Sequence, residues 1–277
     1  MEGRKGRSAE FEIKFLDNVT KVELLNKYSN AARRIILLDY DGTLVPFSKL
    51  PSTAIPGAEM LETLSKIADN PLNEVFIVSG RDSQTLEKWF SQIPVGLIAE
   101  HGAKNSKKSG EWVTESTALA EDWKQKIEKI MAEYVNKCPH SFIEKRNSPL
   151  PGIIGMPTLG DGIIRAKELC DDLSKFASHH SLNILNGNKV IEVRAKGVNK
   201  GKAISHILNG NDYDFILCIG DDQTDEDMFR KLATRPEAFT IKVGNEASFA
   251  KYNLYNPYMV QSLLHTLSLY APGNILS

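Results

Sequence analysis

The sequence has few cysteines, no long apolar run and almost no net charge. Its three cysteines (Cys138, Cys170 and Cys218) are scattered without metal-type spacing, which indicates a reducing compartment and argues against a disulfide framework. No apolar run approaches the length of a membrane span, and the basic residues 1–7 lack the apolar core of a signal peptide. With 34 basic and 35 acidic residues the net charge is -1, so bulk charge indicates neither a nucleic acid nor a membrane as a partner. We therefore expect a cytoplasmic protein.

One stretch, residues 35–44, organises the rest of the chain. Four apolar residues in a row predict a strand buried on both faces of a parallel sheet, and the run ends in Asp39, Asp41, Gly42 and Thr43. In open α/β sheets the working residues follow the carboxyl ends of strands, where Asp39 and Asp41 can converge on one point. Two such carboxylates repel each other unless a cation lies between them, and Mg²⁺ takes oxygen ligands of this kind. The alternative is an ordinary turn, since Asp and Gly both favour turns.

Other predicted strands also end in polar residues. We predict four more buried strands, at residues 74–78, 96–99, 214–219 and 239–244. Ser79, Gly80 and Arg81 follow the first of these and precede a helix, an arrangement that suits an anion. The alternative is that the residues after Arg81 only cap that helix. His101 and Gly102 follow the next strand, and the histidine is either a ligand contact or an ordinary loop residue.

A run of acids follows residues 214–219, and a lysine opens the helix before them. Asp221, Asp222 and Asp225 form the run, and Lys200 opens a helix predicted to end near residue 208. Taken singly, a lysine is most often a solvated surface residue, and acids favour the first turn of a helix. Acids, a hydroxyl and a lysine at successive strand ends together predict a Mg²⁺-dependent phosphoryl-transfer site. In such a site one aspartate attacks phosphorus and a second acid moves the proton.

The pattern of elements changes in the middle of the chain. The elements predicted there are helices at 117–137 and 164–178, a strand at 141–146 and a hairpin over 182–194. They do not alternate as strands and helices do in a parallel sheet, so we expect an inserted α+β module. The run at 148–157 is rich in Pro and Gly and is predicted to be neither a helix nor a central strand.

The 277 residues, 42% hydrophobic and 25% charged, suffice for one or two domains. The predicted fold is α/β, with a Rossmann-like parallel-sheet core and an inserted α+β cap domain. The predicted boundaries are an N-terminal arm with one helix at 1–30, a discontinuous core at 31–105 and 197–277, and a cap at 106–196.

Six motifs run through the core and the end of the insertion. They are LDYDGTL at 38–44, SGR at 79–81, AEHG at 99–102, EVR at 192–194, VNKG at 198–201 and GDDQTDE at 220–226. Together they resemble the trehalose-6-phosphate phosphatase family of the haloacid-dehalogenase-like superfamily, and the resemblance extends from about Arg34 to the last predicted helix. The N-terminal arm also resembles the connector before such domains in two-domain trehalose-phosphate synthase/phosphatase proteins. The resemblance thus implies a small sugar phosphate as substrate and a trehalose-phosphate synthase domain or subunit as a partner.

The resemblance also implies roles for individual residues. Asp39 would be the nucleophile and Asp41 the general acid/base. The phosphate would be held by Thr43, Ser79 and Lys200. The cofactor Mg²⁺ would bind Asp39, the Asp41 carbonyl and Asp221, with Asp222 or Asp225 in support. The remaining implied substrate contacts are Gly80, Arg81, His101, Gly102, Glu144, Arg146 and Glu192.

The predicted cap departs from the family pattern. Glu144 and Glu192 match the acids that contact sugar hydroxyls, but the family's cap lysine is replaced by Arg146. The aromatic-basic run that the family carries a few residues later reads LPGIIG at 150–155. The core therefore predicts the reaction, whereas the substrate is either trehalose 6-phosphate or another sugar phosphate such as a sucrose or glucosylglycerol phosphate. A non-catalytic regulatory domain is a third hypothesis, against which the complete set of core motifs counts.

Overall fold

The computed structural model describes residues 13–48, 53–108, 110–114, 122–139, 141–144, 153–155, 161–180, 182–187 and 190–270. Its helices are α1 Asn18–Asn30, α2 Ala58–Ala68, α3 Ser83–Phe90, η2 Glu100–Gly102, α4 Asp122–Lys137, α5 Asp161–Ala177, α6 Lys200–Leu208, α7 Glu226–Leu232 and α8 Pro257–Ser268. Its strands are β1 Arg34–Leu38, β2 Asn73–Val78, β3 Gly96–Ala99, β4 Lys104–Ser106, β5 Val113–Thr114, β6 Phe142–Glu144, β7 Ile153–Gly155, β8 Leu182–Gly187, β9 Val190–Ala195, β10 Phe215–Gly220, β11 Ala238–Val243 and β12 Tyr252–Leu254. None of these helices is long and apolar enough to cross a membrane.

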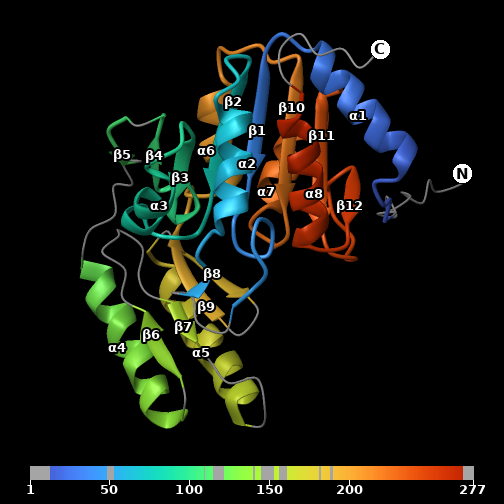
Figure 1. The fold of residues 1–277 in the computed structure, drawn as a ribbon. Coiled ribbons are helices and arrows are strands. Elements are labelled where there is room, and N and C mark those ends of the chain that lie inside the picture. Colours follow the sequence, from blue (N-terminus) through green and yellow to red (C-terminus); the bar gives the residue numbers. More distant parts are fainter. Residues whose placement is uncertain are drawn as a thin grey trace, which may run out of the picture.

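The described strands form one large sheet and one small sheet (Figure 1). The large sheet has the order β12-β11-β10-β1-β2-β3-β4-β5, and it is parallel from β12 to β3. All residues of β1, β10 and β11 are buried, as expected for central parallel strands covered on both faces. The predicted Rossmann-like parallel core is therefore confirmed. The short strands β4, β5 and β12, at the two ends of the sheet, were not predicted.

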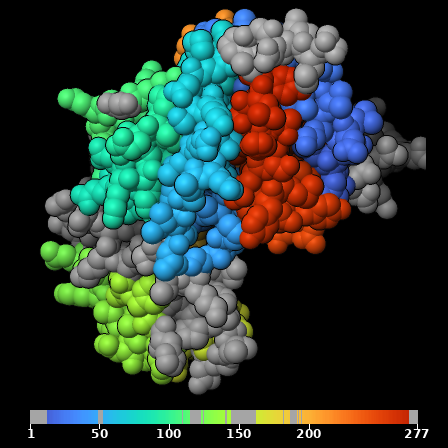
Figure 2. All heavy atoms as spheres, in the orientation of Figure 1, coloured from blue at the N-terminus to red at the C-terminus, as the bar shows by residue number. Residues whose placement is uncertain are grey.

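Helices cover both faces of the large sheet. Side chains of successive strand residues point to opposite faces, so β1 contributes to two separate clusters. Ile36 and Leu38 pack in a cluster with α1, α2, α3 and α8, whereas Ile35 and Leu37 pack with α6 and α7. Figure 2 shows α2 and α8 side by side on one of these faces. The core is thus a three-layer sandwich that leaves the carboxyl ends of its strands for the site.

The small sheet is antiparallel, with the order β6-β7-β9-β8. Helices α4 and α5 pack on it through a cluster of their own, which includes Trp123, Ile127, Leu169 and Leu173. The predicted α+β insertion is therefore present as a second sheet with two helices, drawn below the large sheet in Figure 1.

The prediction that residues 148–157 hold no central strand was wrong. Strand β7 lies between β6 and β9 in the small sheet. The three prolines of the run, at 149, 151 and 157, fall outside the three residues of β7, so none of them removes a hydrogen-bond donor from the strand.

Candidate active site

Three neighbouring strand ends bring predicted site residues to one edge of the large sheet. Strands β1, β2 and β10 are parallel, so their carboxyl ends lie along the same edge. Asp39 follows β1, and its backbone N–H donates to the Ile219 carbonyl of β10 at 2.9 Å. Ser79 follows β2, and Asp221 follows β10. Residues that are far apart in the sequence thus meet here because the sheet is parallel.

Lys200 joins two of the acids at this edge. It is the first residue of α6, whose N-terminus is capped by the Asn199 side chain, which accepts from the Lys202 N–H at 2.7 Å. The Lys200 ammonium Nζ donates to Asp39 Oδ1 at 2.6 Å and to Asp225 Oδ1 at 2.7 Å. The residue is only 1% exposed, unlike the surface lysine that its type alone suggests. Burial of the ammonium is tolerated because two carboxylates neutralise it.

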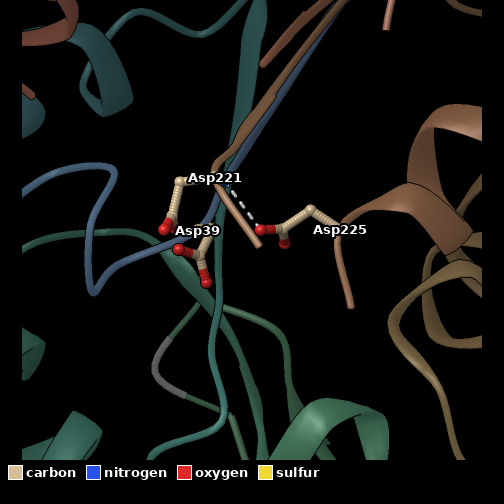
Figure 3. Close-up of side chains that lie close together, drawn as sticks. All are labelled: Asp39, Asp221 and Asp225. Atoms are coloured by element: carbon tan, nitrogen blue, oxygen red, sulfur yellow. Dashed lines mark hydrogen bonds between the residues drawn. The ribbon is translucent and has the colours of Figure 1, made fainter. Parts of the chain in front are cut away.

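Asp39, Asp221 and Asp225 form a cluster of carboxylates (Figure 3). One oxygen from each lies within 4.8 Å of the others. Figure 3 shows the Asp39 and Asp221 carboxylates next to each other, with Asp225 approaching from the opposite side. Three carboxylates this close repel one another, and the single lysine cannot neutralise all three, so a further cation would stabilise the cluster. Carboxylate oxygens are the ligands that a hard divalent cation such as Mg²⁺ takes, and the donor set therefore fits such an ion.

Burial and mutual repulsion raise the pKa of all three acids. Burial is the largest cause for Asp39, whose pKa lies well above its usual range despite the nearby Lys200 ammonium. Burial and then Asp39 raise the pKa of Asp225, and burial and then Asp225 raise the pKa of Asp221 to about 7. Burial lowers the pKa of Lys200, but the Asp225 and Asp39 carboxylates more than offset it, and the pKa ends well above its usual value. The lysine therefore remains a cation, while the acids need a further cation to be ionised together.

The loop between β10 and α7 is held by its own side chains. Asp225 Oδ2 accepts from the N–H groups of Asp221 at 2.9 Å and Asp222 at 3.0 Å. Asp222 Oδ1 accepts from the Thr224 N–H at 2.7 Å and the Thr224 hydroxyl at 2.6 Å. Burial opposes ionisation of Asp222, but the Lys200 ammonium and the Thr224 hydroxyl hold its pKa below the usual range. Asp222 and Asp225 thus shape the loop that presents Asp221.

The Asp41 carboxylate is held by Arg81 in a two-pronged contact. Arg81 Nε and Nη2 donate to its two oxygens at 2.7 Å and 2.5 Å, a bidentate geometry that fixes the carboxylate plane. The guanidinium also lies over the Trp89 ring, 5.3 Å from its centroid. The Asp41 side chain is 29% exposed, so it can meet solvent or substrate. Arg81, which the sequence placed near the phosphate, therefore contacts the residue predicted to transfer the proton.

The chain turns sharply after Asp41. Gly42 has a φ of 82°, a left-handed conformation that glycine adopts readily. A Cβ at this position would also collide with Asp221 and Phe47. Thr43 is buried, and its hydroxyl donates to Asp221 Oδ1 at 3.1 Å. The turn therefore packs the end of β1 directly against the end of β10.

The end of β2 packs against His101. Ser79 is 1% exposed; its Oγ accepts from the Arg81 N–H at 3.1 Å, and its carbonyl accepts from the His101 N–H at 3.0 Å. A Cβ on Gly80 would collide with the His101 ring. His101 itself has a φ of 55°, which is uncommon outside glycine, and Gly102 follows with a φ of 106°. His101 thus packs closely beside the β2 end, and its contact with a ligand stays a prediction.

Two of the predicted sugar contacts belong to strands of the small sheet. Glu144 belongs to β6 and Glu192 to β9, and the register pairs both with Ile153 of β7. The backbones of the two glutamates therefore flank one residue of the small sheet. Arg146 lies outside the described residues. The role of these three residues stays a prediction.

Sequence reasoning missed Lys242 at the edge of the site. Lys242 lies in β11, is 4% exposed, and its Nζ donates to the Asp221 carbonyl. The available signal was a lysine in a strand predicted to be buried, because a buried charge needs a partner. Which group is that partner cannot be read from residue types alone.

Comparisons with known proteins find relatives over most of the chain. A model of the trehalose-phosphatase family matches residues 37–258. The chain is similar to alpha,alpha-trehalose-phosphate synthase (UDP-forming) B of Dictyostelium discoideum, with 40% identity over 253 residues, covering 89% of this chain and 32% of that protein. It is also similar to trehalose-phosphatase of Saccharomyces cerevisiae, with 37% identity over 271 residues, covering 89% of this chain and 30% of that protein. The chain thus spans about a third of the length of these curated relatives.

A solved structure is similar over nearly its whole length. The C-terminal domain of Candida albicans trehalose-6-phosphate phosphatase superposes with a TM-score of 0.84 at 30% identity, covering 94% of this chain and 99% of that domain. The family model also spans the acids, the lysine and both sheets described above, except for the first three residues of β1. On this extent of similarity, the chain belongs to the trehalose-phosphatase family.

Proposed function

We propose that this chain is a Mg²⁺-dependent phosphatase that hydrolyses trehalose 6-phosphate to trehalose and phosphate through an aspartyl-phosphate intermediate. One observation carries the proposal: Asp39, at the end of β1, lies 2.6 Å from the buried Lys200 ammonium and within a cluster of carboxylates. A carboxylate nucleophile, a fixed cation and acids that can hold a metal ion are what phosphoryl transfer to an aspartate requires. Membership of the trehalose-phosphatase family supports the same reaction.

The carboxylate cluster supports the assignment of Mg²⁺. Asp39 and Asp221 would hold the ion together with the Asp41 carbonyl, and Asp222 and Asp225 would keep the loop in place. The ion would neutralise part of the charge between an anionic nucleophile and an anionic phosphate. Asp39 must be ionised to attack, but burial raises its pKa and opposes ionisation. A nearby dication would favour the ionised form and so offset the effect of burial.

The described residues account for the chemical steps. Asp39 would attack phosphorus with a carboxylate oxygen as the bond between phosphorus and the sugar oxygen breaks. Asp41 would give its proton to the leaving oxygen and then take one from the water that attacks phosphorus and releases Asp39. The contact from Arg81 would orient the Asp41 carboxylate for the step in which it takes the proton from water. The phosphate oxygens would be bound by Thr43, Ser79 and Lys200.

The small sheet and its helices would form the cap over the sugar, with boundaries near residues 106 and 196. Glu144, Arg146 and Glu192 would bind sugar hydroxyls, and the loop at Gly80 and at 101–102 would close the other side of the site. A fixed polar site of this kind rejects analogues that lack a hydroxyl, because its own groups are then left unpaired. The chain departs from the family pattern at 150–155, where the family carries an aromatic-basic run. Another sugar phosphate is therefore the second candidate substrate.

We place the activity in the cytoplasm and propose a trehalose-phosphate synthase domain or subunit as a partner. Two observations support the partner. The Dictyostelium relative is named as a synthase, and this chain spans 32% of its length. The near-neutral charge of -1 is consistent with a small-molecule substrate rather than a nucleic acid or a membrane surface.

The proposal is tested by measuring phosphate release from trehalose 6-phosphate, sucrose 6-phosphate and glucose 6-phosphate at saturating Mg²⁺. The matched control is Asp39→Asn, which keeps the shape of the side chain and removes the nucleophile. We expect selective turnover of trehalose 6-phosphate that the variant loses. Faster turnover of another sugar phosphate would favour the second candidate. Absence of turnover by a folded, Mg²⁺-loaded protein would contradict the enzymatic role and favour a regulatory domain.

A further inference from the structure

Lys242 is a charged residue in the interior of the large sheet. All residues of β11 are buried, and Lys242 is 4% exposed. In the sheet register it pairs with Gly220 of β10, the residue immediately before Asp221. An apolar side chain at this position would pack without desolvating a charge. The lysine therefore depends on nearby polar partners, and these lie beside the active site.

The Lys242 ammonium contacts two acceptors. Its Nζ donates to the backbone carbonyl of Asp221 and lies 3.9 Å from Glu226 Oε1. Glu226 is the first residue of α7 and is 5% exposed. Both acceptors belong to the segment that follows β10. The lysine thus fastens this segment to the neighbouring strand.

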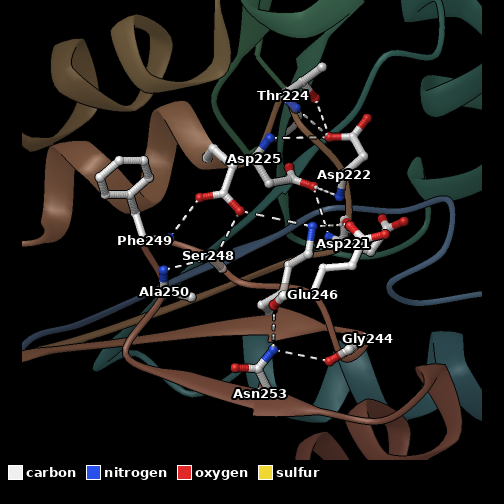
Figure 4. Close-up of polar contacts among 12 residues, drawn as sticks. Asp221, Asp222, Thr224, Asp225, Gly244, Glu246, Ser248, Phe249, Ala250 and Asn253 are labelled. Carbon is white, nitrogen blue, oxygen red and sulfur yellow. Dashed lines mark hydrogen bonds and ion pairs between the residues drawn. The ribbon is translucent and has the colours of Figure 1, made fainter. Parts of the chain in front are cut away.

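Glu226 is itself fixed by the loop between β11 and β12 (Figure 4). Its Oε1 accepts from the Ser248 hydroxyl at 2.7 Å, and its Oε2 accepts from the Phe249 N–H at 2.8 Å. Asn253 ties the same loop to β12, since its Nδ2 donates to the Glu246 carbonyl at 3.3 Å. Figure 4 shows these contacts continuing into the loop that begins at the end of β10. The lysine and its carboxylate partner are therefore linked by hydrogen bonds to the loop between β11 and β12.

The residue that this anchor holds is Asp221. Its N–H donates to Asp225 Oδ2 at 2.9 Å, its carbonyl accepts from Lys242, and its carboxylate accepts from Thr43 at 3.1 Å. With its N–H and its carbonyl both fixed, the backbone keeps the carboxylate in the cluster with Asp39. We propose that Lys242 is a positioning residue that orients the Asp221 carboxylate toward Mg²⁺, an inference that rests on the proposed function.

Orientation of a metal ligand by an outer hydrogen bond has a measurable consequence. Loss of such a partner commonly weakens metal affinity or activity by about 10–100-fold. Lys242→Met removes the ammonium and keeps an unbranched side chain, so we expect the Kd for Mg²⁺ to rise about tenfold or more. The KM for the sugar phosphate at saturating Mg²⁺ should stay near that of the wild type, because the lysine contacts the Asp221 peptide and not the substrate.

Calorimetric titration with Mg²⁺ tests this inference without any substrate. The matched control is Lys251→Met, because the Lys251 ammonium, like that of Lys242, donates to backbone carbonyls. Its acceptors are the carbonyls of Arg235 at 2.6 Å and Ala238 at 2.7 Å. These contacts lie at the opposite end of β11, since Ala238 is its first residue. The control variant should keep the wild-type Kd for Mg²⁺ within about twofold, because its contacts lie away from Asp221.

A second variant, Glu226→Gln, keeps the shape of the carboxylate and removes its charge. This variant should also raise the Kd for Mg²⁺, by a smaller factor than Lys242→Met. If Lys242→Met does not fold, the Kd of Glu226→Gln tests the inference in its place. The inference would be overturned if folded Lys242→Met and Glu226→Gln bound Mg²⁺ with the wild-type Kd. It would also be overturned if Lys242→Met and Lys251→Met raised the Kd for Mg²⁺ by the same factor. A wild type that binds Mg²⁺ but hydrolyses no sugar phosphate would refute the proposed function alone. A wild type that binds no Mg²⁺ would refute both.

Discussion

Replacing Asp221 by asparagine is expected to stabilise the metal-free protein at alkaline pH, although it removes a proposed metal ligand. The Asp221 carboxylate lies in a cluster with Asp39 and Asp225, and burial together with the Asp225 and Asp222 carboxylates raises its pKa to about 7. The folded protein without metal therefore resists ionisation of this group. An asparagine carries no charge, and its oxygen can still accept the hydrogen bond from Thr43.

The magnitude follows from the pKa difference. A shift from 3.8 to about 7 is roughly three units, and at about 1.4 kcal/mol per unit the ionised group costs up to ~4 kcal/mol. Because the folded-state pKa of this acid is raised, the cost is absent below about pH 4, grows with pH and is complete above about pH 7. Neighbouring acids share the proton, so we expect about half of this ceiling, ~2 kcal/mol, or a rise in Tm of about 5 °C.

The assay is thermal unfolding followed by circular dichroism, with a chelator present, at about pH 4 and about pH 8. Asp221→Asn should melt above the wild type at the higher pH and close to it at the lower pH. Saturating Mg²⁺ should reverse the order, because binding at a hundredfold excess over Kd stabilises the wild type by about 2.7 kcal/mol and the variant lacks the ligand.

Asp222→Asn is the adjacent control with the opposite sign. The pKa of Asp222 is depressed, so its ionised form stabilises the fold above the unfolded-state pKa and this contribution is lost as pH falls. Its neutral variant should melt below the wild type at about pH 8. The reasoning is refuted if Asp221→Asn is less stable than the wild type without metal at that pH, or if its effect does not change with pH.

Three further substitutions test the packing of the site by chemical denaturation in metal-free buffer. Lys200→Met leaves two buried acids without their cation and should cost about 3–5 kcal/mol of unfolding free energy; a loss below about 1 kcal/mol would contradict the buried pairing. Gly80→Ala drives a Cβ into the His101 ring and should cost about 1–3 kcal/mol; an unchanged midpoint would mean that the ring moves freely. Tyr40→Phe removes the 2.6 Å hydrogen bond to the buried Ala54 carbonyl and should cost about 1–2 kcal/mol, and equal stability would show that this carbonyl finds another donor.

The fold could be predicted where burial left a simple pattern in the sequence. Strands β1 and β10 carry apolar runs, at residues 35–38 and 215–219, because both faces of a parallel sheet are covered. Strand β7 could not be predicted, because it has three residues between prolines and forms only where β6 and β9 supply hydrogen-bond partners. Strand β5 has two residues and β12 has three, and both depend on their neighbours in the same way.

The residues of the site were predictable, but several of their contacts were not. Asp39 and Asp221 were assigned to one edge because strand ends in a parallel sheet converge. The burial of Lys200 depends on a contact across 161 positions of sequence, which residue type alone does not reveal. The pairing of Asp41 with Arg81 depends likewise on how β1 and β2 lie in the sheet. Sequence motifs thus locate the chemistry, and the sheet decides which groups meet.

The central claim is that Asp39 takes the phosphoryl group, and acid quenching of a single turnover tests it most directly. Trehalose 6-phosphate with a radiolabelled phosphate is mixed with the Mg²⁺-loaded protein, and the label bound to precipitated protein is measured over time. The account predicts protein-bound label that hydroxylamine releases, as expected of an acyl phosphate, and none in Asp39→Asn. Label on the Asp39→Asn variant, or turnover by that variant at the wild-type rate, would contradict it.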